Sequence, residues 1–485
     1  MKQIDINAMI IMALFYWLMM GLSSCYRQPV TGYERVDKPA NIYPAYQGTV
    51  IPPNIAPFNF EIREVGERFK IRISVPARDS FEITTKKIVK IPVAKWKNLL
   101  NNNRGSPLEI HVFAKRQEGW IKYDEILFHI AEEPVDPFIA YRLIEPGYVI
   151  WNRMGIYQRN IENFDESPIM INTLTDNNCI NCHSFCRNDP ETMLFHLRKH
   201  HAGTIIVMNG NVKKLDLKTP DMPSAAVYPR WHPDGRYIAF SSNVTQQGFH
   251  AANTNKVEVF DKESDIFIYD PQTNTIFTDS MICSPHRFET FPEWSPDGKY
   301  LYYHSATARL MPREYDLVKY DLLRIPFDPQ TATFGLAADT LVSAENTGKS
   351  ATFARLAPDG KNVVFCLSDY GTFPVWHNET DLYRLDLETM QMHNLEIINS
   401  NRTESYHSWS SNGRWLVFAS RRLDGRFTRL FISYFDHDNS MHAPFLVPQE
   451  NPSYYDDLLL SYNIPEFITG KVKIPPRKFR RVARN

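Results

Sequence analysis

One ten-residue pattern occurs four times in the second half of the chain and limits the folds that this sequence can adopt. Each copy places a large apolar residue before a Pro-Asp-Gly turn or a close variant, and an apolar run follows the turn. The copies occupy residues 231–240, 294–303, 356–365 and 409–418. Proline presets the first dihedral angle of such a turn, aspartate accepts backbone hydrogen bonds, and glycine supplies the left-handed position. Each copy therefore predicts a hairpin that joins two β-strands.

A second run of strand-like residues follows each copy. These runs occupy residues 265–271, 317–321, 381–386 and 430–436. Two hairpins in every repeat make one four-stranded blade, so the repeats predict a β-propeller.

The repeats resemble those of TolB-like β-propellers, whose blades carry the sequence W-S-P-D-G-R/K-x-I-x-F. The resemblance covers roughly residues 174–447. It implies a fold and no activity, because propellers of this type occur in binding proteins, peptidases and lyases. The sequence contains no G-x-S-x-G nucleophile motif, so we exclude the peptidases as models.

The segment 179–217 aligns with the repeats as a degenerate first blade whose turn lacks glycine. Five blades can then be counted, whereas closure of a propeller usually needs six or seven. We predict six blades, with seven as the alternative. The missing strands are expected within residues 302–353 or after residue 445.

This first blade contains the sequence Cys179-Ile-Asn-Cys182-His183, which is the attachment signal of a c-type haem. In that interpretation the two thiols bond the haem vinyl groups and His183 binds the iron. A disulfide and a zinc site are the alternatives. Zinc normally needs four ligands, commonly with a second close pair, and no other C-x-x-C occurs. We therefore expect one covalently attached haem c, with a disulfide between Cys179 and Cys182 as the main alternative.

The second axial ligand of such a haem has several candidates near the motif. His196 is the first choice, because it follows on the neighbouring strand, and Met208 is a further candidate. Methionine would raise the reduction potential and a second histidine would lower it. The others are Met193, His200 and His201.

Five more histidines lie in or near the blade hairpins. Oligogalacturonate lyases resemble this blade repeat and bind a metal through histidines at the propeller face, so the resemblance implies a metal-dependent lyase as an alternative. The five histidines are His232, His286, His304, His377 and His407. Scattered histidines with ordinary hydrogen bonds are the preferred explanation, because their spacing is irregular.

The first residues resemble a bacterial lipoprotein signal. An apolar run follows Lys2 and ends in Leu-Ser-Ser-Cys25. Cleavage after residue 24 and lipid on Cys25 would anchor the protein in the cell envelope. It would be an outer-membrane lipoprotein that faces the periplasm, or a surface protein, where haem attachment and disulfides are both possible. Residues 25–57 are rich in proline and predict an extended tether.

Residues 58–172 contain short runs with a period of two, which predict half-buried antiparallel strands and an Ig-like β-sandwich. Residues 448–485 are expected to form one strand and a basic tail that is solvated. The formal net charge of the whole chain is −1, so we expect no nucleic-acid partner.

These observations predict an all-β protein in which the sandwich precedes a propeller of residues 173–447. We expect a lipid-anchored binding or scaffold protein that carries one c-type haem and contacts a protein or a glycan at a propeller face. Catalysis is not the preferred interpretation. The alternatives are an electron-transfer cytochrome and a metal-dependent polysaccharide lyase.

Overall fold

The computed structural model describes residue 30 and residues 32–147 and 152–485. The predicted signal peptide and Cys25 lie outside these residues, so lipidation stays a prediction. The described chain is built almost entirely from β-strands, which confirms the all-β class. None of its helices has the length and apolar character that a membrane span requires.

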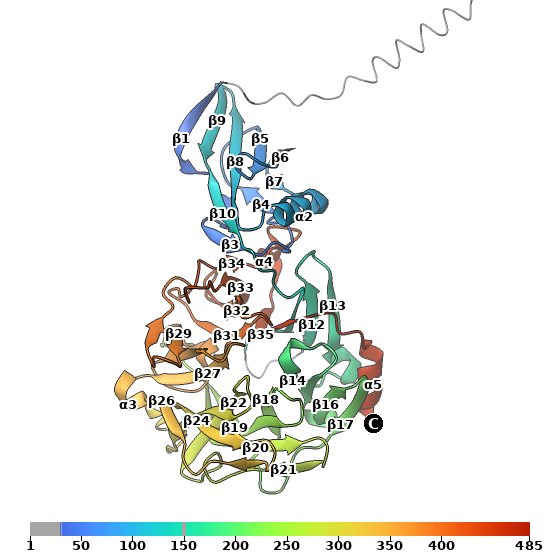
Figure 1. The fold of residues 1–485 in the computed structure, drawn as a ribbon, viewed down its shortest axis with the longest axis vertical. Helices are drawn as coiled ribbons and strands as arrows, with labels where there is room; N and C mark the ends of the chain where they lie inside the picture. Colours follow the sequence, from blue (N-terminus) through green and yellow to red (C-terminus); the bar gives the residue numbers. More distant parts are fainter. Residues whose placement is uncertain (1–29, 31, 148–151) are drawn as a thin grey trace, which may run out of the picture.

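Two sheets and one helix form the N-terminal part of the protein (Figure 1). The larger sheet has the order β1-β9-β8-β10-β3, with β5 bound to β8 and β6 bound to β5; the smaller has the order β2-β4-β7. The strands are β1 (Tyr33–Pro39), β2 (Ile42–Tyr43), β3 (Thr49–Ile51), β4 (Phe60–Ile62), β5 (Arg68–Ser74), β6 (Ser80–Thr85), β7 (Ile88–Val89), β8 (Pro107–Arg116), β9 (Gly119–Asp124) and β10 (Ile126–Ile130). Helix α2 (Val93–Asn102) buries Trp96, Leu99 and Leu100.

This part differs from the expectation in the segment that was predicted to be an extended tether. Strands β1 and β3 lie within the expected tether and pair in parallel with β9 and β10, so the chain joins the sheet from Tyr33 onward. A proline-rich composition indicates extended backbone, but it does not show whether that backbone has a partner strand.

Six further sheets surround one axis. Their strand orders are β35-β11-β12-β13, β14-β15-β16-β17, β18-β19-β20-β21, β22-β23-β24-β25 with β26 beside β24, β27-β28-β29-β30, and β31-β32-β33-β34. The first strand of each sheet contacts the first strands of two others. As a result β35, β14, β18, β22, β27 and β31 form a closed ring (Figure 1).

The strands of these six sheets have the following bounds. They are β11 (Phe138–Ile144), β12 (Met154–Asn160), β13 (Glu166–Ile171), β14 (Ile180–Phe185), β15 (Met193–Leu197), β16 (Gly203–Met208), β17 (Asn211–Leu215), β18 (Ala226–Trp231), β19 (Ile238–Phe249), β20 (Val257–Asp270), β21 (Thr275–Phe277), β22 (Arg287–Trp294), β23 (Tyr300–Thr307), β24 (Asp321–Asp328), β25 (Thr333–Phe334), β26 (Asp339–Val342), β27 (Ser350–Leu356), β28 (Asn362–Ser368), β29 (Asp381–Asp386), β30 (Met392–Asn394), β31 (Glu404–Trp409), β32 (Trp415–Ser420), β33 (Arg429–Tyr434), β34 (Phe445–Leu446) and β35 (Ser461–Ile468).

One sheet joins the two ends of the ring. Strand β35 pairs antiparallel with β11, so that Phe467 lies opposite Ile139. The pairing therefore differs from the expected limits, which placed residues 138–171 in the sandwich. Strand β35 lies after residue 445, one of the two places where the missing strands were expected. A period of two identifies a strand, but it does not identify a partner that lies far away in the sequence.

The turn predictions of the four repeats are confirmed. Gly235, Gly298, Gly360 and Gly413 all have φ between 67° and 74°. Each glycine N–H donates to the carbonyl three residues earlier, as Gly298 does to Ser295 at 2.9 Å.

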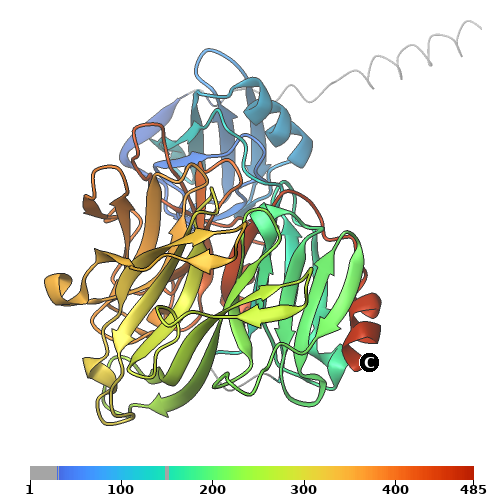
Figure 2. The same ribbon diagram turned by 60° about the horizontal axis from the view of Figure 1, so that its bottom comes forward.

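The N-terminal sheets pack against the ring through a continuous hydrophobic core. Polar contacts reinforce the junction, since Ser411 donates to Asp136 at 2.6 Å and Tyr434 to Glu133 at 2.8 Å. The basic tail expected to be solvated forms α5 (Pro476–Arg484), which lies against the ring (Figure 2) and buries Phe479 and Ala483. Its apolar residues recur three to four positions apart, which gives the short helix one buried face.

Candidate functional site

Each of the six innermost strands contains a bulge at an equivalent position. The residue in each bulge is not glycine and has φ between 48° and 55°. The residues are Cys182, Tyr228, Phe291, Phe353, Tyr406 and Ile464. The pairing register shifts at all six, as expected for a bulge. A left-handed backbone at a bulky residue is rare, so its recurrence marks a structural requirement of the ring.

The C-x-x-C-H sequence therefore lies on β14 with its last two residues in this bulge. Cys182 and His183 correspond to Tyr406 and His407 of β31. In three other strands a proline stands where His183 stands in β14: Pro229, Pro292 and Pro465. Only Tyr228-Pro229 and Phe291-Pro292 are aromatic-proline pairs, so no sequence signal common to all six strands marks the bulge.

The bulged aromatic residues close the axis of the ring. The Phe291 ring lies 4.5 Å from that of Tyr228 and 4.1 Å from that of Phe353, measured between centroids. The gap that remains beside Cys182 and His183 has a volume of about 20 Å³. A volume of this size accommodates about one water molecule.

His183 is buried, and neither ring nitrogen makes a hydrogen bond of acceptable geometry among the described residues. Burial lowers the pKa of His183 to about 3, and the charges of Arg142 and Arg230 lower it further. The imidazole is therefore neutral at pH 7, the form in which histidine binds metals. Burial raises the pKa of the Cys182 thiol, which disfavours the thiolate.

The other residues predicted for the haem site lie apart from this gap. Cys179 lines a different cavity, described below. His196 hydrogen-bonds through Nδ1 to the Thr204 hydroxyl at 2.7 Å and lines an outer groove. Met208 packs in a separate apolar cluster around Trp231.

A covalently attached haem does not fit this arrangement. The two thiols face different cavities, and the space beside His183 is far smaller than a macrocycle. His196 and Met208 do not line that space, so neither is placed to be the second axial ligand.

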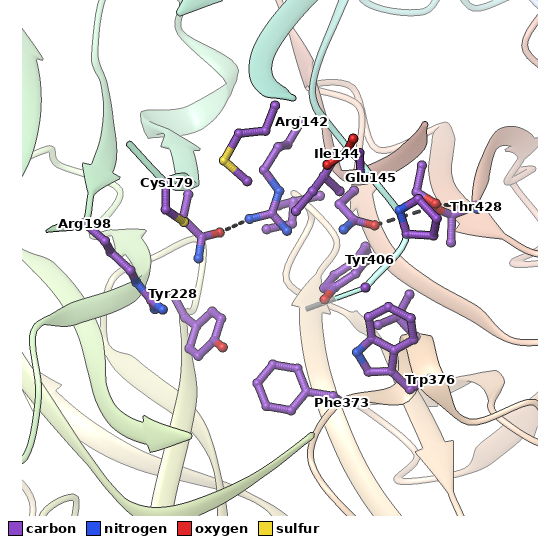
Figure 3. A pocket seen from close by; sticks show the side chains of 18 of the residues that line it. Arg142, Ile144, Glu145, Cys179, Arg198, Tyr228, Phe373, Trp376, Tyr406 and Thr428 are labelled. Carbon is purple, nitrogen blue, oxygen red and sulfur yellow. Dashed lines mark hydrogen bonds between the residues drawn. The ribbon is translucent and has the colours of Figure 1, made fainter. Parts of the chain in front are cut away.

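A larger cavity lies at the end of the ring where the innermost strands begin. Its volume is about 270 Å³. Four cationic side chains line it, namely Arg142, Arg198, Lys199 and Arg421. Aromatic side chains form another part of its wall (Figure 3): Tyr228, Phe373, Trp376 and Tyr406. We call it the arginine cavity.

Two of these arginines lack an acidic partner among the described residues. Arg142 is 8% exposed and donates to the Asn181 side-chain oxygen, but its Nε–H has no acceptor. The Arg421 guanidinium lies 4.5 Å from the centre of the Trp376 ring, and its Nε–H also has no acceptor. Burial lowers the pKa of Arg421 to about 10, so it remains charged at pH 7.

The opposite end of the ring provides a contrast. A cavity of about 350 Å³ there contains Arg230, Arg355, Glu293 and Glu466, one from each of four innermost strands. Arg230 forms ion pairs with Glu293 and Glu466, both at 3.2 Å, and Arg355 pairs with Glu293 at 3.1 Å. The charges of these four residues neutralise one another, and the exposed Arg187 is a further cation among the described residues that line this cavity.

Four of the five histidines considered for a metal site make separate contacts, and the fifth, His286, is exposed. His304 accepts from the Ala354 N–H at 3.0 Å, His407 contacts the Val364 carbonyl at 2.8 Å, and His232 contacts the Gly298 carbonyl at 2.9 Å. His377 pairs with Glu258 at 3.1 Å. Within the described ranges no three His, Cys, Asp or Glu side chains are grouped so that they could hold a metal ion.

No family model matches the chain, and no curated protein matches it. Similar solved structures include an oligogalacturonate lyase in complex with manganese, at 12% identity and a TM-score of 0.26, over 59% of this chain and 55% of that one. A puromycin-hydrolysing peptidase of Mycobacterium tuberculosis has 10% identity and a TM-score of 0.39, over 86% and 57%. Prolyl oligopeptidase B from Galerina marginata has 10% identity and a TM-score of 0.35, over 70% and 43%. The chain thus spans about half the length of these proteins, and similarity this low supports no conclusion about activity.

Proposed function

We propose that the chain is a lipid-anchored binding protein of the cell envelope whose ligand occupies the arginine cavity. In this proposal the six sheets are the blades of a propeller that β35 closes, and the N-terminal sheets form a separate sandwich-like unit. The lipoprotein-like signal ending at Cys25 supports the location. Two arginines without acidic partners at a cavity wall carry the assignment of the site.

The cavity has the composition of a ligand site. Binding sites combine apolar and aromatic walls with a few polar groups that fix the orientation of the ligand. Here the rings of Trp376 and Tyr406 supply the wall, and Arg142 and Arg421 supply the polar groups. The wall combines residues of the strands, such as Arg142 and Tyr406, with residues outside them, such as Trp376 and Arg421.

A glycan array probed with the mature protein tests this proposal. We expect Trp376→Ala to abolish binding, because Trp376 forms part of the wall and contacts Arg421. Phe249→Ala is the matched control, because this ring is 72% exposed on another sheet. Equal binding by the wild type and Trp376→Ala would refute the cavity as the site.

An electron-transfer cytochrome of the c type is the second candidate. Two observations favour it, namely the complete motif and the neutral His183 ring, whose nitrogens make no hydrogen bond of acceptable geometry to the described residues. Cys179, Cys182 and His183 would hold the haem, which would supply a one-electron redox centre. Their present positions would have to change, because β14 occupies the ring with all six of its residues buried.

A further inference from the structure

We propose that the arginine cavity recognises the carboxylate of an acidic sugar, that is, a uronic acid residue of a glycan. This inference rests on the proposed function, since it names the class of ligand that the same cavity takes.

The charges of the described wall favour an anion. Arg142, Arg198, Lys199 and Arg421 line the cavity, and Glu145 is the one acidic side chain among the described residues that do so. A positive charge at the wall of a cavity acts through a medium of low dielectric, where Coulomb attraction is stronger than in water. A carboxylate entering the cavity would therefore be attracted to its wall.

The orientation of the two arginines suits a planar anion. The Arg142 guanidinium donates to the Asn181 side chain, and its Nε–H is buried without an acceptor among the described residues. The Arg421 guanidinium lies over the Trp376 ring, and its Nε–H is also buried without an acceptor among the described residues. A guanidinium offers parallel N–H donors that match the two oxygens of a carboxylate. A buried guanidinium without an acidic partner is costly, and the charge of a carboxylate bound in the cavity would offset part of that cost.

The remaining wall favours a sugar ring as the carrier of the carboxylate. Phe373, Trp376 and Tyr406 present flat apolar surfaces beside the arginines (Figure 3). Such surfaces suit the C–H faces of a pyranose, which is itself a rigid ring and loses little entropy on binding. A volume of about 270 Å³ admits a chain end or a small oligosaccharide.

Calorimetric titration of the mature protein tests the inference with a tetrasaccharide that contains glucuronic acid. Its carboxyl-reduced form, in which each glucuronic acid has become glucose, is the matched ligand. We expect the acidic form to bind at least about tenfold more tightly, and we expect added NaCl to weaken its binding. Arg421→Gln should remove this preference, whereas Arg309→Gln, at an exposed arginine outside the cavity, should keep it.

Arg421→Lys adds a variant that keeps the charge and loses the parallel donors, and it should show an intermediate affinity. Equal affinity for the two tetrasaccharides would overturn the assignment of the ligand to the acidic sugars, but it would not contradict the proposed function. Preference for a tetraglutamate peptide over the acidic sugar would overturn the assignment to a glycan. Binding of neither sugar would also overturn the inference, while the array with Trp376→Ala decides the proposed function separately.

Discussion

Left-handed backbone positions determine the geometry of this protein at the scale of single residues. Glycines occupy these positions in the Pro-Asp-Gly turns, or close variants, of the four repeats. Residues with side chains occupy them in the six bulges. The glycine positions were predictable because the turn chemistry is local. The bulges were not, because no residue preference marks a left-handed cysteine, tyrosine or phenylalanine in a strand.

We expect Gly298→Ala to destabilise the protein by about 2–4 kcal/mol. The left-handed φ of +73° penalises any side chain, and a Cβ would lie closer than 3.0 Å to the buried His232 ring. Gly210→Ala is the control, since its φ is +72° but nothing lies within 4 Å of a Cβ there. Chemical denaturation measures both variants, and equal losses would show that the His232 contact has no role.

The buried histidines should make the protein sensitive to acid. Burial lowers the pKa of His407 to about 3, while its pKa in the unfolded chain is near 6.5. Between these values the unfolded chain binds a proton that the folded protein does not, so stability falls as the pH decreases below 6.5. In His407→Gln the loss of stability between pH 7 and pH 5 should be smaller by about 1–2 kcal/mol than in the wild type.

His377 serves as the control, because its pKa is raised in the folded protein, whereas that of His407 is lowered. Burial acts to lower its pKa, but hydrogen bonds with Glu258 and Glu379 outweigh this and raise it to about 9. Its contribution to stability is complete below pH 6.5 and is lost as the pH rises through 9. His377→Gln should therefore be more destabilising at pH 6 than at pH 10. Parallel pH profiles for the two variants would contradict these assignments.

Among the strands and helices, β35 matters most for closure of the ring, because it completes the sheet formed by β11, β12 and β13. The sequence predicted a strand after residue 448 but did not identify its partner, since pairing between the two ends of a chain depends on the closure of the whole ring. For the same reason, the sequence pattern led us to assign β11–β13 to the sandwich, whereas they pair with β35. Local alternation was enough to identify these strands, and only tertiary contacts assign them to a sheet.

Truncation after residue 457 should therefore abolish cooperative unfolding. It removes β35 and exposes the buried residues of β11, including Ile139 and Leu143. Truncation after residue 473 is the control, because it keeps β35 and removes only α5 with its Phe479 contact. Thermal unfolding followed by circular dichroism distinguishes the two. A cooperative transition in the variant truncated after residue 457 would mean that β35 does not close the ring.

At the scale of the whole molecule, the two ends of the ring differ in charge pairing. The ion pairs around Arg230 leave little net charge at one end, while Arg142 and Arg421 face the arginine cavity at the other. The sequence indicated a propeller face as the binding surface, but it did not reveal which arginines are paired. The residues that line this cavity lie far apart in the sequence, as Arg142 and Ser461 do. Only the closed ring brings them together.

Attachment to a membrane is also a property of the whole molecule. If the signal is processed as predicted, Cys25→Ser should release the protein into the soluble fraction, because stable attachment depends on its acyl chains. Fractionation and labelling with a fatty-acid analogue measure this, with Cys283→Ser as a control. Membrane association that survives Cys25→Ser would refute the lipoprotein assignment.

The central claim is that the C-x-x-C-H segment is the axial bulge of one blade in a binding propeller. Intact mass and visible absorption of the protein, produced in a host that attaches c-type haem, test it most directly. We expect the mass of the polypeptide with its lipid and no haem, no Soret band, and an unchanged spectrum in Cys182→Ala. A mass gain of one haem with a Soret band that Cys182→Ala removes or alters would contradict it and establish a cytochrome.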